Sequence, residues 1–301
     1  SSNAHYRVYG QFFNRDAVIL SNSQPAADDW RMGQAGFRLD WDKSTNDLLT
    51  LQGEYYSGRM AQRGAADTVA DGINVVGRWS HRFTETSDLA IQLYYDRTDR
   101  RIPNAFAEVL DTYDVDFQHR FALGGRQSLV WGLGYRVSKD NLTGNPVIAF
   151  LPPRISRNSF SGFVQDEISV VRDRLHLTLG TKIEHNEYTG LEYQPSGRLS
   201  WKLSPRQTVW GAISRAVRTP SRIDTELFAP ATPPFLIAGG PNFVSEKLRA
   251  FELGYRTQPL DRISLSLATF YNKYDDLRSV ERLNPSAVLP VVIANRLNGE
   301  S

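Results

Sequence analysis

The sequence has no cysteine, no long apolar run and little excess charge of either sign. Without cysteine the chain has no disulfide, no thiolate metal site and no cysteine nucleophile. No apolar run approaches the roughly 18 residues that a membrane-spanning helix requires. This does not exclude a membrane-spanning β-barrel, whose alternating strands keep the overall hydropathy low. The net charge is +2 with acids and bases interspersed, so no nucleic-acid partner is predicted.

Helical periodicity is also nearly absent, and the best candidate is a turn or two within residues 220–228, which open on a proline. The dominant pattern is alternation of apolar and polar residues, which is the period of a pleated strand with two different faces. Residues 175–187 show it well. Leu175, Leu177 and Leu179 share one face, and His176 and Thr178 share the other.

This alternation recurs along the whole chain and predicts about fourteen strands. Their expected spans are residues 5–13, 30–41, 47–57, 72–83, 88–98, 107–121, 127–138, 157–171, 175–187, 192–203, 207–217, 246–257, 262–274 and 288–297. The fold class is therefore all-β, in one domain of residues 5–301. Residues 1–4 (Ser-Ser-Asn-Ala) resemble the remnant of a cleaved expression tag and are set aside.

The connections between the expected strands alternate in length. Short polar turns occur at residues such as 43–46, 84–87 and 204–206, and long loops are expected at residues 14–29, 58–71, 99–106, 139–156, 218–245 and 275–287. Short turns at one end of the sheet (the turn end) and long loops at the other (the loop end) are typical of outer-membrane proteins. The pattern predicts an antiparallel transmembrane β-barrel, or a large part of one.

Alternation alone does not say which face meets water. The polar face carries charged pairs such as Arg38 with Asp40 and Lys182 with Glu184, which suit a wet interior. Aromatic residues fall near strand ends, where the two lipid interfaces of a barrel favour them. They are Trp30, Trp41, Tyr55, Tyr56, Trp79, Tyr94, Tyr95, Tyr135 and Trp201. We therefore expect the apolar face to point outward at lipid.

Several consecutive segments also resemble a known family. FSGFVQDEI followed by RDRLHLTLGTKIEHN is similar to the middle of the barrel of TonB-dependent outer-membrane receptors, and QPSGRLSWKLS, WGAISRAVRTPS, FELGY and ATFYNKYDDL continue the match in order. The resemblance covers residues 160–277 well and the earlier strands by pattern. Gly240 and Ser245 depart from it, because the family has an asparagine and a proline there.

This resemblance implies a protein of the bacterial outer membrane that contacts membrane lipid and is not an enzyme. Such receptors are wide barrels of about twenty-two strands, filled by an amino-terminal plug domain that contacts TonB. They import ferric siderophores or other small nutrient complexes. We expect residues 1–301 to hold barrel strands without the plug, since strands begin at His5.

Ligand contacts in such a receptor are expected from inward residues near the loop end and from the loops. Arginine and tyrosine suit an anionic, aromatic-rich complex. The candidates are Tyr56, Arg136, Arg157 and Arg218 on the polar face, Arg97 and Tyr193 at loop ends on the apolar face, and Phe228 and Phe235 in the longest loop. For each, the alternative is a solvated wall residue engaged in charge pairing between strands.

No cofactor and no metal are predicted, because the five histidines are scattered without ligand spacing. Two other functions stay open. A passive, porin-like channel needs neither plug nor energy coupling. An outer-membrane hydrolase needs a serine near a histidine, and Ser161 and His176 share a face on neighbouring expected strands.

Overall fold

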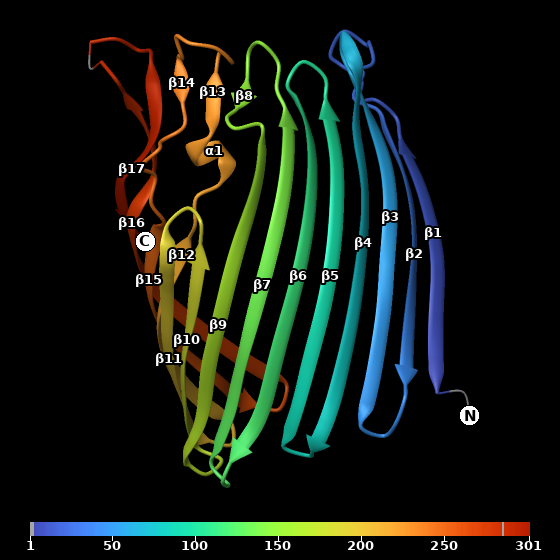
Figure 1. The fold of residues 1–301 in the computed structure, drawn as a ribbon. Coiled ribbons are helices and arrows are strands. Elements are labelled where there is room, and N and C mark those ends of the chain that lie inside the picture. The colour runs from blue at the N-terminus through green and yellow to red at the C-terminus, as the bar shows by residue number, and fades with distance from the viewer. Residues whose placement is uncertain (1–2, 285) are drawn as a thin grey trace.

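The computed structural model describes residues 3–284 and 286–301. Fourteen long strands form one curved sheet (Figure 1). They are β1 (Ala4–Arg15), β2 (Trp30–Asp42), β3 (Asp47–Gln62), β4 (Ala65–Thr84), β5 (Ser87–Ile102), β6 (Phe106–Leu123), β7 (Gln127–Thr143), β9 (Arg154–Val171), β10 (Leu175–Asn186), β11 (Gly190–Ser204), β12 (Gln207–Arg218), β15 (Glu246–Leu260), β16 (Ile263–Arg282) and β17 (Val291–Glu300). All fourteen expected strands are thus confirmed.

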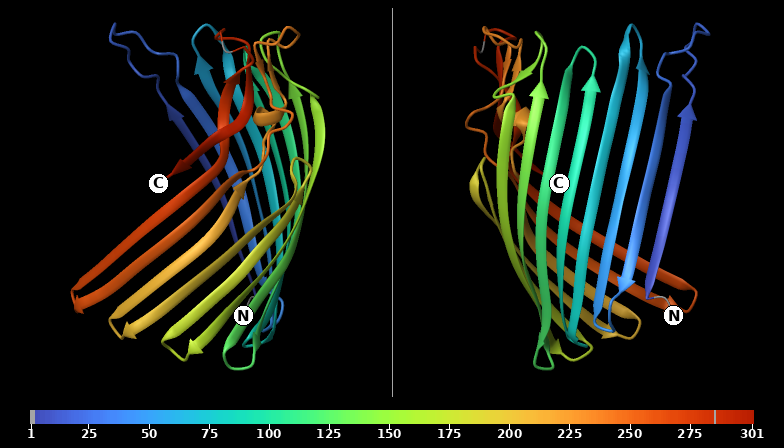
Figure 2. Two further views of the ribbon diagram at one scale, coloured as in Figure 1. Left: turned by 90° about the vertical axis from the view of Figure 1, so that its left-hand side faces the viewer. Right: turned by 45° about the vertical axis from the view of Figure 1, so that its right-hand side comes forward.

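Each long strand pairs antiparallel with the next long strand along the chain. The sheet bends into a wall that is open on one side, as Figure 2 shows. Within the described residues no register joins β1 to β17, so these two strands are its edges. The arrangement is the large part of a barrel that the alternation predicted.

Three short strands and one helix lie at the loop end. They are β8 (Ala149–Phe150), α1 (Arg222–Thr225), β13 (Leu227–Ala229) and β14 (Ile237–Ala238). The helical turn expected within residues 220–228 is confirmed by α1. In the described part of the chain no helix is long and apolar enough to cross a membrane.

Several connections are shorter than the sequence indicated. Residues 58–71 were expected to be a loop, yet strands β3 and β4 continue through them and turn at residues 63–64. Residues 99–106 shorten in the same way to a turn at 103–105. Polar residues mark where a strand leaves the lipid, but backbone pairing continues beyond that level because an antiparallel hairpin needs no apolar face to keep its hydrogen bonds.

The wall has an outer face rich in exposed apolar side chains. Leu93 is 57% exposed and Leu133 is 45% exposed, so neither lies in a dry core. In the described residues only five apolar side chains are buried: Leu142, Phe150, Phe243, Ala250 and Ile293. A water-soluble domain of this size would bury many more. The expected orientation, with apolar residues toward lipid, is therefore confirmed.

Charged and aromatic residues bound the apolar zone on this outer face. Trp79 and Trp201 lie near the turn end, and Tyr95 and Tyr135 lie toward the loop end. Just beyond Tyr95, the outward-facing Arg97 binds Asp111 at 3.1 Å. A charge pair facing outward at this level marks the upper limit of the hydrocarbon layer.

Three aromatic residues were assigned to this outer zone wrongly. Trp30 lies an odd number of positions from the outward-facing Phe37 of β2, so it lies on the inner face. Tyr56 and Tyr94 directly follow and precede the outward-facing Tyr55 and Tyr95, and adjacent residues of a strand point to opposite faces. Tyr56 and Tyr94 therefore lie on the inner face. The ring of Tyr56 covers Gly72 there, with ring atoms 2.5 Å from where a Cβ on that glycine would lie.

Candidate ligand-binding site

The connection between β12 and β15, residues 219–245, folds against the inner face at the loop end and carries α1, β13 and β14. Its strand β13 pairs with β8, and β14 pairs in parallel with β17. Two connections that are far apart in sequence are thereby joined with the start of β17 into one surface (Figure 1). This surface lies at the loop end of the wall.

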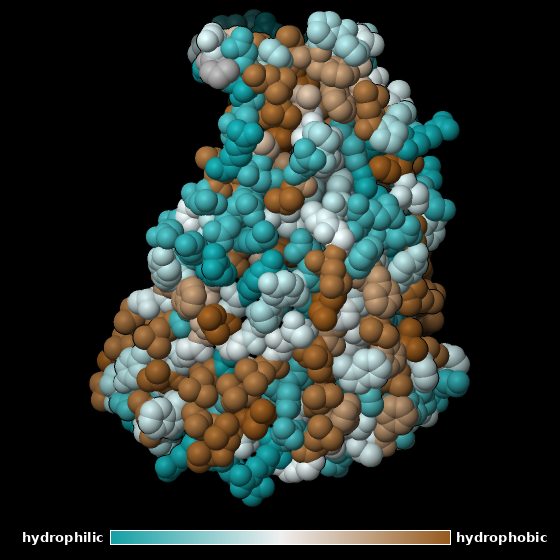
Figure 3. Space-filling model, turned by 60° about the vertical axis from the view of Figure 1, so that its left-hand side comes forward, coloured by the Kyte–Doolittle hydropathy of each residue, from teal (hydrophilic) through white to brown (hydrophobic). Residues whose placement is uncertain are grey.

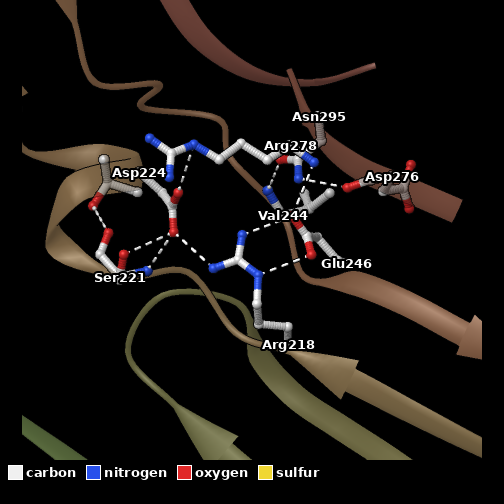
Figure 4. A network of polar contacts seen from close by, with 9 residues as sticks. Arg218, Ser221, Asp224, Val244, Glu246, Asp276, Arg278 and Asn295 are labelled. Atoms are coloured by element: carbon white, nitrogen blue, oxygen red, sulfur yellow. Dashed lines mark hydrogen bonds and ion pairs between the residues drawn. The ribbon is translucent and has the colours of Figure 1, made fainter. Parts of the chain in front are cut away.

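The first polar cluster at the base of this surface centres on Asp224 of α1, whose side chain is fully buried (Figure 4). One carboxylate oxygen of Asp224 accepts hydrogen bonds from the backbone N–H of Ser221 at 2.9 Å, from its hydroxyl at 2.8 Å and from Arg218 at 3.0 Å. Arg278 of β16 lies 3.4 Å from the other oxygen. The helix turn is thus fixed to two strands of the wall. We call this set the Asp224 cluster.

The guanidinium of Arg218 is shared within the Asp224 cluster. It donates to both oxygens of Glu246 on β15, at 2.7 and 2.8 Å, in a bidentate pair. Hydrogen bonds from Arg218 hold the pKa of Glu246 below its ordinary value. Burial by itself would raise the pKa of Asp224, but the bonds from Ser221 and Arg218 outweigh it and lower that pKa. Both acids are therefore charged at neutral pH.

The second cluster centres on Glu226, at the end of α1. Glu226 accepts hydrogen bonds from Arg157 of β9 and from Arg222 of α1, the latter at 2.9 Å. Arg222 also donates to Asp140 of β7 at 2.9 Å. The guanidinium of Arg157 lies over the ring of Tyr188, 3.6 Å from its centroid, and burial raises the pKa of that phenol. We call this set the Glu226 cluster. It joins residues that are far apart in sequence, since Arg157 and Glu226 are 69 positions apart and Asp140 and Arg222 are 82 positions apart.

A cavity of about 430 Å³ lies between the Glu226 cluster and the inner wall. Phe106, Leu142 and Phe150 form apolar parts of its lining, and Glu108 and Asp140 form acidic parts. Burial, with the neighbouring charge of Asp140, raises the pKa of Glu108. The loop-end surface therefore combines aromatic rings with both signs of charge.

The structure brings some of the predicted contact residues together here. Arg157 and Arg218 lie at the loop end, each held by a carboxylate from the folded connection. Phe228 and Phe235 pack on one another in that connection, with ring centroids 4.7 Å apart. These four residues share one region of the molecule.

The other four predicted residues lie elsewhere. Arg136 binds Asp114 at 2.9 Å farther down the inner wall, and Tyr56 covers Gly72. Arg97 and Tyr193 lie on the outer face, as their place in the alternation indicated. Arg215 stacks on Tyr193, 4.3 Å from the ring centroid. Ligand contact stays a prediction for all eight.

The sequence reasoning missed the acids that hold these arginines, namely Asp140, Asp224 and Glu226. Asp224 stands three residues after Ser221, a spacing typical of a helix start, which is a signal that was available. No such local signal marks Asp140, because its partner Arg222 comes from a distant segment.

The serine and histidine of the hydrolase alternative are far apart. In the register of β9 with β10, Ser161 lies opposite Glu184 and His176 lies opposite Ser169. Eight residues along a strand correspond to about 26 Å. This distance counts against the hydrolase alternative, because facing the same side does not fix the offset between strands. Among the described residues no group of three or more His, Asp or Glu side chains is arranged to hold a metal ion.

The chain resembles known proteins over nearly its whole length. A family model described as TonB dependent receptor-like, beta-barrel, matches residues 2–298. An iron-regulated outer membrane virulence protein of Vibrio cholerae is 27% identical over 154 residues, which are 50% of this chain and 23% of that relative.

Solved receptors share the fold. The siderophore receptor PirA of Pseudomonas aeruginosa superposes with a TM-score of 0.76 at 17% identity, covering 100% of this chain and 55% of that chain. The ferric enterobactin receptor of the same species superposes with a TM-score of 0.81 at 16% identity, covering 100% of this chain and 54% of that chain. The hemophore receptor HasR of Serratia marcescens superposes with a TM-score of 0.83 at 15% identity, covering 99% of this chain and 56% of that chain. The chain thus spans about half the length of the receptors it matches.

Proposed function

Because the chain belongs to the TonB-dependent receptor-like β-barrel family of the bacterial outer membrane, we propose that it forms part of the wall of an uptake receptor. The cargo is a ferric siderophore or a similarly scarce nutrient complex. Transport is driven by TonB, which acts through a plug domain distinct from the strands described above. Members of this family are receptors and not enzymes.

The observation that carries this proposal is the family match, because it extends over residues 2–298. The names of similar proteins support the cargo class: PirA is a siderophore receptor, and the Vibrio cholerae relative is iron-regulated. The orientation of the wall agrees with it, since the inner face carries the charge pairs that a water-filled lumen requires.

The loop-end surface supplies the chemistry for such a cargo. Arg157 and Arg218 offer cationic guanidinium groups, and Phe228 with Phe235 offers aromatic surface. An anionic, aromatic-rich complex is bound well by that combination. Arg136 and Tyr56 extend it down the inner wall. In this proposal the cargo takes over part of the charge pairing that now holds the arginines.

Uptake in cells tests the proposal directly. The full-length receptor containing this chain is expressed in a bacterium that lacks its own siderophore receptors, under iron limitation. We expect saturable uptake of one radiolabelled ferric siderophore from a panel, and loss of that uptake when TonB is deleted. A receptor that transports none of the panel, or that transports equally without TonB, contradicts the proposal.

The arginines are tested in the same cells by replacing Arg136 and Arg218 together with glutamine. We expect uptake at low siderophore concentration to fall by about tenfold or more, because each arginine contributes a charged hydrogen bond. Arg206→Gln is the matched control, since Arg206 pairs with Asp261 at the turn end, far from the loops. Unchanged uptake of every siderophore by the double variant removes both residues from the site.

A passive channel is the second candidate, and the polar inner wall is the observation that favours it. The two functions differ in their need for energy. Dissipating the proton gradient stops TonB-driven uptake but leaves diffusion through an open pore unchanged. If uptake persists after the gradient is dissipated and never saturates, the protein is a passive channel and not a TonB-driven receptor.

A further inference from the structure

The cavity of about 430 Å³ beside the Glu226 cluster is lined by residues with unused hydrogen-bonding groups. In the described part of the chain, five buried side-chain polar atoms have no hydrogen-bond partner, and two of them belong to this lining. They are Oδ1 of Asp140 and Nε of Arg157. The side chain of Asp140 is only 10% exposed. A buried donor or acceptor without a partner is costly, so a molecule that pairs both atoms would stabilise this region.

The two atoms belong to neighbouring positions of the inner wall. In the register of β7 with β9, Arg157 lies opposite Ser138, two residues from Asp140 on the same face. In the register of β6 with β7, Glu108 lies opposite Leu142, two residues from Asp140 in the other direction. Diagonal neighbours across an antiparallel pair are within reach of long side chains. One patch of the wall therefore carries two acids and a guanidinium group.

Two of the guanidinium groups at the cavity already have partners. Arg222 donates through all three of its nitrogens, to Glu226, to Asp140 and to the backbone carbonyl of Pro152. Arg157 donates to Glu226 through Nη2, which leaves its Nε without a partner. A ligand can thus accept a hydrogen bond from Nε of Arg157 without displacing Glu226.

Glu108 is an acid of the lining that lacks a close partner. Arg100 lies directly opposite it in the register of β5 with β6, yet within the described residues no ion pair of 4 Å or less joins the two. Burial and then the charge of Asp140 raise the pKa of Glu108, and Arg100 and Arg222 offset this only in part. A cationic group between Glu108 and Asp140 would favour the charged form of both acids.

The charges around the cavity are balanced. The lining contains three arginines and two acids, and Glu226 beside it supplies a third acid. A ligand that brings a net charge would upset this balance. A ligand that carries one positive and one negative group would keep it, and would also match the free acceptor and the free donor.

The rest of the lining is largely apolar and comes from both the wall and the folded connection. Phe106 and Phe150 lie edge to face, with ring centroids 6.1 Å apart. Leu142 and Phe150 are buried, and Ile223 of α1 lies at the same cavity. An apolar side chain of a ligand would be removed from water here.

The cavity lies beyond the hydrocarbon layer. Arg97 and Asp111 mark the upper limit of that layer, and Glu108 lies three residues from Asp111 along β6, toward the loop end. Figure 3 shows the same division on the side of the molecule that carries β15–β17, with hydrophobic residues gathered over the lower part and a hydrophilic zone above them. The ligand therefore enters from water and not from lipid.

From this combination we infer that the cavity binds a free α-amino acid with an apolar side chain, in its zwitterionic form. The ammonium group lies between Glu108 and Asp140 and donates to Oδ1 of Asp140. The carboxylate accepts a hydrogen bond from Nε of Arg157. The apolar side chain packs on Phe106 and Phe150. The inference goes beyond the proposed function, because Arg157 alone of the eight predicted cargo contacts lines this cavity.

Equilibrium dialysis of the full-length receptor in detergent tests the inference, with radiolabelled L-phenylalanine as the probe. We expect saturable binding. N-acetyl-L-phenylalanine lacks the ammonium group, L-phenylalaninamide lacks the carboxylate, and glycine lacks the apolar side chain. Each is expected to compete about tenfold more weakly or worse, because each loses one of the three contacts. An analogue that competes as well as L-phenylalanine overturns the inference, and so does the absence of saturable binding, since the cavity would then hold water only.

Glu108→Gln tests whether the binding belongs to this cavity. The change keeps the shape of the side chain and removes its charge, so we expect L-phenylalanine to bind about tenfold more weakly. Glu252→Gln is the matched control. Glu252 directly precedes the outward-facing Leu253 of β15 and therefore also lies on the inner wall, but away from the cavity. Heat-modifiable gel migration shows that both variants are folded. Equal loss of binding in the two variants, or no loss in Glu108→Gln, overturns the inference.

Discussion

At the scale of single residues, arginine–carboxylate clusters take the place of a hydrophobic core at the loop end. Asp224 has no exposed side-chain surface and meets two arginines and Ser221. In the same way, Glu226 forms an ion pair with Arg157, and Asp140 forms one with Arg222. Buried acids of this kind keep their charge only because several donors reach them at once. Removing one acid is therefore more costly than removing an exposed partner.

Asp224→Asn is expected to loosen the connection of residues 219–245 from the wall. The change removes the charge that Arg218 and Arg278 share, and we expect a loss of about 1–3 kcal/mol in local stability, since Arg218 is partly exposed. Hydrogen exchange of the connection measures it. Asp261→Asn, at an acid that is 86% exposed, is the control and is expected to change little. Equal exchange in the two variants would contradict the role of the Asp224 cluster.

The same cluster predicts a pH dependence. The pKa values of Asp224 and Glu246 are below their ordinary values, so both acids are charged in the folded state to lower pH than in the unfolded state. Their contribution is fully present above the ordinary values of about 3.9 and 4.3. It is lost as the pH falls through the lower, folded-state pKa values.

We therefore expect proteolysis of residues 219–245 to stay constant from neutral pH down to about pH 5 and to increase below about pH 4. An acid-active protease and a fixed digestion time give the measurement. Asp224→Asn should show a smaller change over the same range. A connection that is equally protected at pH 3 and at neutral pH would sink this prediction.

At the scale of strands, glycines on the inner face make room for large rings on the neighbouring strand. A Cβ on Gly132 of β7 would lie 2.5 Å from the ring of Phe163 and 2.5 Å from the carbonyl oxygen of Phe117. The Trp210 ring covers Gly254 at similarly short range. Glycine at position 132 thus relieves crowding on the inner wall.

Gly132→Val is expected to destabilise the pairing of β6, β7 and β9 by about 1–3 kcal/mol, because both a ring and a backbone oxygen must move. The urea midpoint of the receptor in micelles measures the loss. Gly77→Val is the control, since no atom lies within 4 Å of its added Cβ. If the Gly132 variant is as stable as the Gly77 variant, the sheet accommodates the valine side chain without loss of stability, and the prediction is wrong.

At the scale of the whole molecule, the direction in which each face points determines what the protein is. Leu133 of β7 is exposed on the outer face, while Gln118 of β6 is exposed on the inner face. Exposure has opposite consequences on the two faces, because one meets hydrocarbon and the other water. A soluble β-sandwich would bury Leu133 in its core and would not expose it on an outer face.

Leu133→Arg is therefore expected to cost about 2–4 kcal/mol, since it places a charge near the middle of the lipid-facing zone. Gln118→Arg places the same charge on the inner face and is expected to cost little. Folding into lipid vesicles, followed by heat-modifiable migration, compares the two. The reverse order of stability would mean that the apolar face is not the one in contact with lipid.

The sequence by itself determined the strands and their faces. Alternation within residues such as Leu175–Asn186 is a property of neighbours in the chain, and the pleat turns it directly into two faces. The order of the motifs from Phe160 onward indicated the family for the same reason, since each motif is a run of neighbouring residues. Strand lengths at the loop end were less readable, since pairing there persists after the apolar alternation stops.

Only the tertiary structure decided which side chains meet. The register placed Ser161 and His176 eight residues apart, and the folding of residues 219–245 onto the wall brought Arg222 to Asp140 and Glu226 to Arg157. Such contacts depend on strand offsets and on how loops close, and no local pattern encodes either.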